Sequence, residues 1–141
     1  MESLIVEDLN TMQFSYIAGK VDWFCPKQYI LKTALENSHF KYTVFYDSQL
    51  VGMARVISDR ATFFCIRDLA IIPEYQRNGI GSKLLEKIID DIKHAIFKSP
   101  CMVEIQCSLG TEGFYKKAGF KIRPNCGNGA GMYLLIKPQE L

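Results

Sequence analysis

The sequence lacks the marks of several protein classes. None of its apolar runs approaches the ~20 residues of a membrane-spanning helix. Its N-terminus has no basic stretch followed by an apolar one, so no secretory signal is expected. The net charge is only +2, which does not indicate a polyanion-binding protein. We therefore expect a cytoplasmic protein that binds neither nucleic acid nor membrane.

A disulfide framework and a zinc site are also not predicted. The cysteines are odd in number, scattered and without a Cys-x-x-Cys pair: Cys25, Cys65, Cys101, Cys107 and Cys126. We expect reduced, mostly buried thiols and no metal. Cys107 as an acyl carrier has no support, because neither His39 nor His94 lies near it in the sequence.

What the chain does have is the composition of one globular domain. It has 141 residues, of which 48% are hydrophobic and 23% charged. That length allows one buried core and leaves no room for a second. We predict a single domain over residues 1–141.

Hydrophobic periodicity and turn residues predict the first elements. Residues 3–6 form a short apolar run that is expected to be a strand. A helix over residues 10–18 should begin with Asn10 as its N-cap and end at Gly19. A second helix is expected to begin at Pro26 and to end at residues 37–38, with an apolar face of Tyr29, Ile30, Ala34 and Leu35.

Three strands should follow these helices. Residues 42–46 and 50–57 are joined by a turn at 47–49, which predicts a hairpin. Residues 62–72 form a further strand. Its eleven residues exceed the usual strand length, so we expect a bend or bulge inside it.

The second half of the chain alternates helices and strands. A long helix after Gly81 should bury one apolar face, made of Ile80, Leu84, Leu85, Ile88, Ile89, Ile92 and Ile96. Strand-like residues 101–107, a short helix over 111–118 and two last strands at 120–122 and 132–136 complete the order. This order predicts a mixed α+β sheet with a helix crossover.

A glycine-bearing loop connects the strand at 62–72 to the long helix. It reads Gln-Arg-Asn-Gly-Ile-Gly over residues 76–81 and follows Pro73. A glycine loop that leads into a helix N-terminus offers backbone N–H groups to phosphate. A P-loop has four residues between its first glycine and Gly-Lys-Ser/Thr, whereas one residue separates Gly79 from Gly81. The dinucleotide pattern requires a small residue where Leu84 stands. Both patterns are therefore excluded. The alternative is an ordinary bend.

The loop resembles the pyrophosphate loop, Gln/Arg-x-x-Gly-x-Gly, of the GNAT superfamily of acyl-CoA-dependent N-acetyltransferases. Residues 112–120 are similar to the Phe-Tyr-x-x-x-Gly-Phe segment of the same family, and the element order matches it throughout. Residues 51–55 and 129–133 are further similar to bacterial GNAT proteins and to plant-type arylalkylamine (serotonin) N-acetyltransferases. The resemblance implies a mixed, mostly antiparallel, twisted sheet flanked by helices, with a splayed central strand pair.

The resemblance also implies acetyl-CoA as the acetyl donor. Backbone groups of Leu69, Ala70 and Ile71 would pair with the pantetheine arm, and the Ile71 N–H would bond the thioester carbonyl and its oxyanion. The pyrophosphate would be held by backbone N–H groups of Arg77, Asn78, Gly79, Ile80, Gly81 and Ser82. The Arg77 side chain either adds charge to the phosphates or is a solvated surface group.

Three side chains are candidates for catalysis. The resemblance implies that Tyr115 returns a proton to the departing thiolate, since a phenol has an ordinary pKa of ~10. Asp68 or Glu104 would remove the amine proton, with an ordered water as another option. Each carboxylate could instead be paired with Arg67 or a lysine. Many family members carry an asparagine just before the tyrosine helix, where this chain has residues 108–110, Ser-Leu-Gly.

The predicted function is transfer of an acetyl group from acetyl-CoA to a primary amine by direct attack. A small amine or arylalkylamine is favoured over protein lysine, because Trp23, Phe24, Tyr29 and Tyr133 are candidates to line the acceptor pocket. The alternative is a non-catalytic acyl-CoA-binding or sensing module. Dimers are frequent in the family, so the resemblance also implies a possible homodimer.

Overall fold

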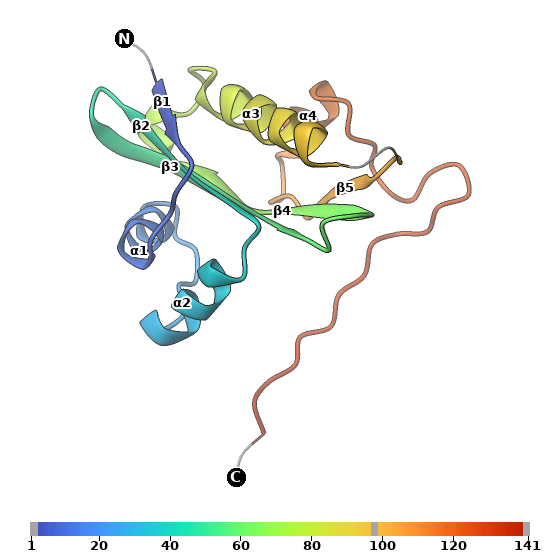
Figure 1. The fold of residues 1–141 in the computed structure, drawn as a ribbon, viewed down its shortest axis with the longest axis horizontal. Helices are drawn as coiled ribbons and strands as arrows, with labels where there is room; N and C mark the ends of the chain where they lie inside the picture. The colour runs from blue at the N-terminus through green and yellow to red at the C-terminus, as the bar shows by residue number, and fades with distance from the viewer. Residues whose placement is uncertain (1–2, 97–98, 140–141) are drawn as a thin grey trace. The chain divides into compact units, whose positions relative to one another are not determined.

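The computed structural model describes residues 3–96 and 99–139. The chain forms two compact units, Met1–Gln106 and Cys107–Leu141, which are taken in turn. Figure 1 shows the order of their elements. The single-domain expectation stays a prediction.

The first unit is built on a five-stranded mixed sheet. Its strands lie in the order in which they occur: β1 (Ser3–Val6), β2 (Phe40–Tyr46), β3 (Gln49–Ser58), β4 (Phe63–Ile71) and β5 (Met102–Ile105). Neighbouring strands are antiparallel except β4 and β5, which are parallel. This arrangement confirms the predicted α+β class and mixed, mostly antiparallel sheet.

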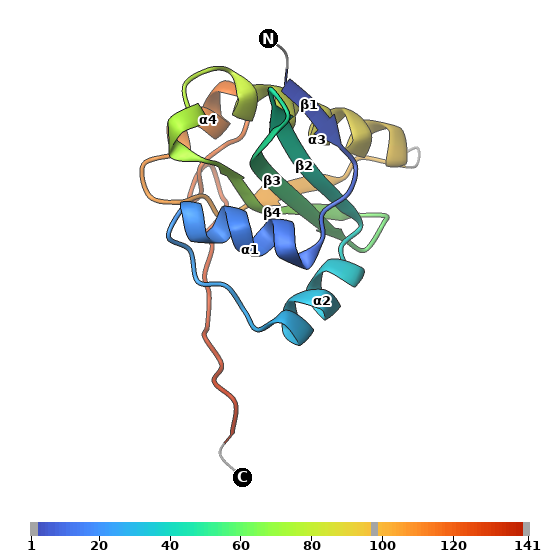
Figure 2. The same ribbon diagram turned by 90° about the vertical axis from the view of Figure 1, so that its left-hand side faces the viewer.

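Helices cover both faces of this sheet, as Figures 1 and 2 show. The helices α1 (Thr11–Lys20) and α2 (Gln28–Glu36) lie on one face and α3 (Ile80–Ala95) on the other. The helix α3 is the crossover that parallel strands need. It buries the predicted apolar face, except that Ile89 is only partly buried and Ile96 lies just past its end.

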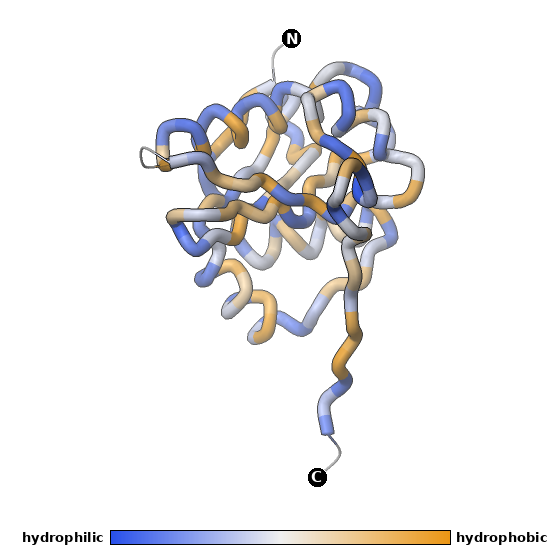
Figure 3. Tube along the Cα trace, turned by 90° about the vertical axis from the view of Figure 1, so that its right-hand side faces the viewer, coloured by the Kyte–Doolittle hydropathy of each residue, from blue (hydrophilic) through white to orange (hydrophobic). Residues whose placement is uncertain are grey.

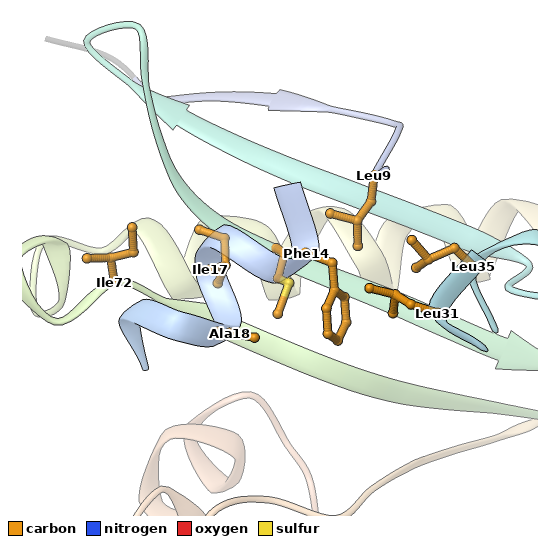
Figure 4. Close-up of a cluster of buried hydrophobic side chains, with 9 residues drawn as sticks. Leu9, Phe14, Ile17, Ala18, Leu31, Leu35 and Ile72 are labelled. Carbon is orange, nitrogen blue, oxygen red and sulfur yellow. The ribbon is translucent and has the colours of Figure 1, made fainter. Parts of the chain in front are cut away.

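The core between α1, α2 and the sheet is an aliphatic cluster with one phenylalanine. Figure 4 labels seven of its side chains, which lie along the sheet beside α1 and α2: Leu9, Phe14, Ile17, Ala18, Leu31, Leu35 and Ile72. Met53 of β3 and Ala70 of β4 belong to the same cluster. The α1–α2 pair is therefore anchored on the two strands that flank the candidate site.

Local sequence signals place most boundaries correctly. Asn10 caps α1 by accepting a hydrogen bond from the Gln13 N–H at 2.8 Å, and the Gln13 side chain accepts one from the Asn10 N–H. The helix runs to Lys20, so Gly19 does not end it. An exposed helical glycine costs only about 1 kcal/mol, which tertiary packing can offset.

The second helix departs further from expectation. It begins at Gln28, two residues after Pro26. Leu31 and Leu35 form its buried face, whereas Tyr29 is 70% exposed. The predicted face was right at Leu35 but wrong at Tyr29 and Ile30, because the helix packs along its Leu31–Leu35 ridge, one i to i+4 step.

The predicted hairpin is confirmed. Asp47 and Ser48 connect β2 and β3, with φ of 52° and 65°. Positive φ at both residues is typical of a two-residue type I′ turn, whose twist matches that of the strands.

The described part of the second unit, residues 107–139, holds one helix, and the last two predicted strands are not formed there. The helix α4 (Glu112–Lys117) is followed by Gly119 with φ of 102°, as expected for a glycine that closes a helix. In the described part of the chain, residues 120–122 and 132–136 form no strand. The side chains at 132–136 are 74% to 89% exposed and give the hydrophobic stretch near the C-terminus in Figure 3. High β propensity gives no strand without a hydrogen-bonded neighbour.

The cysteines are free, but none is fully buried. Four are partly buried and Cys126 is exposed. The expectation of mostly buried thiols was therefore too strong. Along the described segments no helix has the length and apolar character required to cross a membrane.

Candidate functional site

The site begins at a bulge in β4. The residue pairs Arg55–Arg67 and Met53–Ala70 bracket one extra residue on β4. Asp68 lies in this interval with a left-handed φ of 54°. The bulge confirms the bend expected from the strand's length, and such a feature re-aims the strand that carries it.

Past the bulge, β4 separates from β5. The two strands pair from Phe63–Met102 to Ile66–Ile105 and no further. Within residues 3–96 and 99–139, Ala70 and Ile71 pair with β3 alone. The residues predicted to bind pantetheine, Leu69, Ala70 and Ile71, therefore lie on a strand edge without a β5 partner. Such an edge can accept an extended ligand as an added strand.

A short 3-10 turn, η1 (Pro73–Tyr75), connects this edge to the glycine loop. The Gln76 side chain donates a hydrogen bond from Nε2 to the Ile71 carbonyl oxygen at 2.8 Å. The first side chain of the loop thus holds the last residue of β4. Sequence reasoning assigned Gln76 no role, although it opens the glycine motif.

The loop itself presents backbone N–H groups. Gly79 is the N-cap of α3 with φ of 77°, and it has no side-chain capping bond. The first helical bond runs from the Lys83 N–H to the Gly79 carbonyl. The N–H groups of Ile80, Gly81 and Ser82 precede it and have no helical partner. They fit an anion at the positive end of the α3 dipole.

Gly79 has a backbone conformation that favours glycine. A Cβ built on Gly79 meets nothing within 4 Å. Its left-handed backbone, and not the space around it, favours glycine there. Arg77 is another left-handed residue, with φ of 65°. The Arg77 and Asn78 side chains are exposed, as a charged group at the mouth of a phosphate site would be.

The two candidate bases have different surroundings. The Asp68 carboxylate accepts a hydrogen bond from Arg55 Nε at 2.6 Å, and both side chains are largely buried. The partner is thus Arg55 of β3, and not Arg67 or a lysine. Glu104 of β5 is exposed, opposite Cys65, and forms no ion pair among the described residues.

Tyr115 lies buried in the second unit. Its ring makes edge contacts with Phe114, at 4.9 Å between centroids, and with Phe120, at 5.8 Å. Burial, with a smaller effect from Cys107, raises the pKa of Tyr115 to about 12. The phenol therefore keeps its proton at neutral pH. Phe114, its neighbour in the sequence, is only partly buried.

The aromatic residues considered for the acceptor pocket are divided. Trp23 packs against the core cluster. Phe24 is 88% exposed, and Tyr29 and Tyr133 are also exposed. No group of three potential metal ligands occurs in the described residues.

Comparison with known proteins identifies the family of this chain. Residues 38–122 match the profile of the acetyltransferase (GNAT) domain. The chain is 27% identical over 137 residues to an uncharacterized N-acetyltransferase, ycf52, of Gracilaria tenuistipitata, with 90% of this chain and 70% of that protein covered. It is 30% identical to the chloroplastic GCN5-related N-acetyltransferase 2 of Arabidopsis thaliana, over 89% of this chain and 55% of that one.

Solved structures share the fold. A crystal structure from Staphylococcus aureus, described as a probable acetyltransferase, aligns with a TM-score of 0.83 at 24% identity, covering 96% of this chain and all of that one. A GNAT family acetyltransferase from Streptococcus pneumoniae aligns with a TM-score of 0.74, covering 97% of this chain and 98% of that one. At this level of identity the likeness concerns architecture alone.

Proposed function

The chain belongs to the GNAT acetyltransferase family, and from that premise we propose that it transfers the acetyl group of acetyl-CoA to the primary amine of a small molecule by direct attack. One observation carries the proposal. The bulge at Asp68 leaves β4 without its β5 partner and leads, through Gln76, into the left-handed glycine loop of α3.

These residues fit the donor in two places. The edge at Leu69, Ala70 and Ile71 offers backbone groups to the amides of the pantetheine arm. The N–H groups from Arg77 to Ser82 offer an anion site to the pyrophosphate. Bound acetyl-CoA supplies the activated acetyl group.

The Ile71 N–H donates to the thioester carbonyl oxygen and stabilises the negative charge that develops there as the amine attacks. Loss of a proton makes the amine nucleophilic, and Asp68 or Glu104 accepts it, directly or through a water. Glu104 is the freer of the two, because Arg55 holds the Asp68 carboxylate. Both stay candidates.

Tyr115 is proposed to donate the proton that the departing thiolate receives. With a pKa of about 12 it is a weaker acid than an ordinary tyrosine. A free thiol titrates near ~8.5, so complete transfer to a stable thiolate would be unfavourable. Tyr115→Phe therefore tests whether the departing sulfur receives its proton from this phenol.

An acetylation assay with a panel of amines tests the proposal. The purified chain is incubated with acetyl-CoA and tyramine, spermidine or a lysine-containing peptide, and products are identified by mass spectrometry. We expect acetylated small amines, and a loss of roughly 10²-fold or more in kcat for Tyr115→Phe. Tyr16→Phe is the matched control, because Tyr16 is an exposed tyrosine of α1 that has no assigned role in binding or proton transfer.

Two outcomes would count against it. Binding of acetyl-CoA without turnover on any amine would favour the sensing module. Peptide acetylation without small-amine acetylation would move the acceptor to protein lysine. The cytoplasmic location stays a prediction, since one relative is named chloroplastic.

A further inference from the structure

Three basic side chains form a row across the sheet. Lys41 of β2 pairs with Arg55 of β3, and Arg55 pairs with Arg67 of β4. Residues directly opposite one another on adjacent strands project to the same face, with Cβ atoms about 4.5–5.5 Å apart. The next pair along, Met53–Ala70, belongs to the core cluster with α1 and α2. The row therefore lies on the face that these helices cover in part.

Only the middle member of the row is neutralised. Asp68 pairs with Arg55, whose Nη1 also donates to Ser38 Oγ at 3.4 Å. Among the described residues, no carboxylate lies within 4.0 Å of a Lys41 or Arg67 side-chain nitrogen. Glu104 is the nearest other acid of this face by register, opposite Cys65, and it pairs with neither.

This arrangement has an electrostatic cost without a ligand. Like charges directly opposite on adjacent strands destabilise a sheet. Arg67 is exposed and Lys41 is partly exposed, so both can reach a molecule in solution. An anionic group between them would relieve the repulsion, and a guanidinium binds carboxylate and phosphate through paired hydrogen bonds.

The row lies next to the proposed donor edge. Arg67 directly precedes the bulge at Asp68, and Leu69 to Ile71 follow two to four residues later. At about 3.3 Å per residue this is about 7–13 Å along the strand. A small molecule can span that distance with an anionic group at one end and an amine at the other.

We propose that Lys41 and Arg67, the two ends of the row, bind a carboxylate or phosphate group carried by the acceptor amine. The proposal deepens the acetyltransferase function above and rests on it. It makes the acceptor an amine with an anionic end, of the amino-acid or amino-phosphate kind.

Matched amines test this specificity. One pair is 5-aminopentanoate and 5-aminopentanamide, and the other is 3-aminopropyl phosphate and 3-aminopropanol. We expect kcat/KM to favour the anionic member by tenfold or more, mainly through KM. The two pairs show whether carboxylate or phosphate is preferred. Arg67→Gln should abolish the preference and Arg67→Glu should reverse it. Lys93→Gln removes one exposed positive charge from α3, on the other sheet face, and should leave it intact.

A binding measurement separates failure of this proposal from failure of the function. Glutarate and inorganic phosphate carry the anion without the amine. At least one should raise the Tm of the wild type and Lys93→Gln by more than that of Arg67→Gln, because the glycine loop, which can also bind phosphate, is unchanged in all three. That pattern without any acetylation supports the anion site and overturns the transferase. Acetylation with equal kcat/KM for both members of each pair, unchanged in Arg67→Gln, overturns the anion site and leaves the transferase standing.

Discussion

Gly52 of β3 lies directly beside the donor edge of β4. A Cβ at this position would lie 2.5 Å from Ile71 Cδ1 and 3.0 Å from the Ala70 carbonyl oxygen. The Ile71 side chain can turn aside, but the Ala70 carbonyl belongs to the backbone that is proposed to bind the donor. The β4 backbone can therefore lie this close to β3 because residue 52 has no side chain.

We predict that Gly52→Ala weakens acetyl-CoA binding and lowers the free energy of unfolding by about 1–3 kcal/mol, as overpacking does. Calorimetric titration and urea unfolding measure the two effects. Gly19→Ala is the matched control, because Gly19 lies in α1 with nothing within 4 Å of an added Cβ. It should stabilise the chain by up to about 1 kcal/mol. Unchanged acetyl-CoA affinity in Gly52→Ala would contradict the assignment of the edge.

Burial of Tyr115 changes the pH range over which its phenol keeps a proton. The raised pKa of about 12 keeps the phenol protonated at every pH below that value. A general acid acts only while protonated, so an ordinary tyrosine would begin to lose activity near pH 10. Here that loss is displaced toward pH 12.

The kcat of the wild type should therefore show no decline from Tyr115 between pH 7 and pH 10.5. A pH–rate profile with saturating substrates measures this, with Tyr115→Phe as the comparison. A descending limb near pH 10 that vanishes in Tyr115→Phe would show an unshifted tyrosine and would argue against the buried environment.

At the scale of elements, a side-chain hydrogen bond ties the end of β4 to the loop that leads into α3. Gln76 opens this loop, and its amide holds the Ile71 carbonyl. The donor edge and the pyrophosphate loop thus share a contact that does not depend on the donor. Gln76 is inferred to be a positioning residue for both.

We predict that Gln76→Glu raises the KM for acetyl-CoA several-fold, because a carboxylate cannot donate to the Ile71 carbonyl. The effect on kcat should be smaller, since the reacting atoms keep their partners. Gln28→Glu, an exposed position at the start of α2, adds the same charge and should leave KM unchanged. Equal KM values in both variants would show that the bond does not position the loop.

The segment at residues 132–136 shows that a local sequence signal does not always give an element in the structure. Residues 132–136 have the apolar, β-prone composition of a strand, and the sequence predicts one. In the structure they are exposed and form no ladder. Strand formation depends on a neighbour as well as on propensity.

At the scale of the whole molecule, a polar network ties the sheet to α3 and to the end of β1. Tyr42 of β2 is fully buried and donates to Asp91 of α3 at 2.8 Å. Lys87 of α3 pairs with Asp91 at 2.9 Å and with Glu7 at 2.8 Å. Burial, followed by the bond to Asp91, raises the pKa of Tyr42 well above its ordinary value.

This shift predicts alkaline destabilisation. A folded-state pKa above the unfolded value of about 10 means that the stabilisation is complete below pH 10. It is lost as the pH rises further, because only the unfolded state then releases its proton readily. Tm measured from pH 8 to pH 11 should fall more steeply above pH 10 in the wild type than in Tyr42→Phe. Tyr46→Phe, which changes a partly buried tyrosine of the same strand, should keep the wild-type slope.

The sequence by itself determined the order of elements as far as the short helix that holds Tyr115, the α+β class, the glycine loop and the motif around Tyr115. These depend on local signals: the Asn10 cap, the two-residue turn at Asp47, the periodicity of α3 and the spacing of glycines. Even the bulge in β4 was predictable from its length. Such signals lie within a few residues of the structure that they specify.

Only the tertiary structure decided which groups meet. It paired Asp68 with Arg55, placed Gln76 on Ile71, ended the β4–β5 ladder at Ile66 and aligned Lys41, Arg55 and Arg67 in one row. It also left the last two predicted strands unformed. The physical reason is register. Cross-strand partners are far apart in the sequence, and a shift of one residue in their pairing turns every side chain of a strand to the other face.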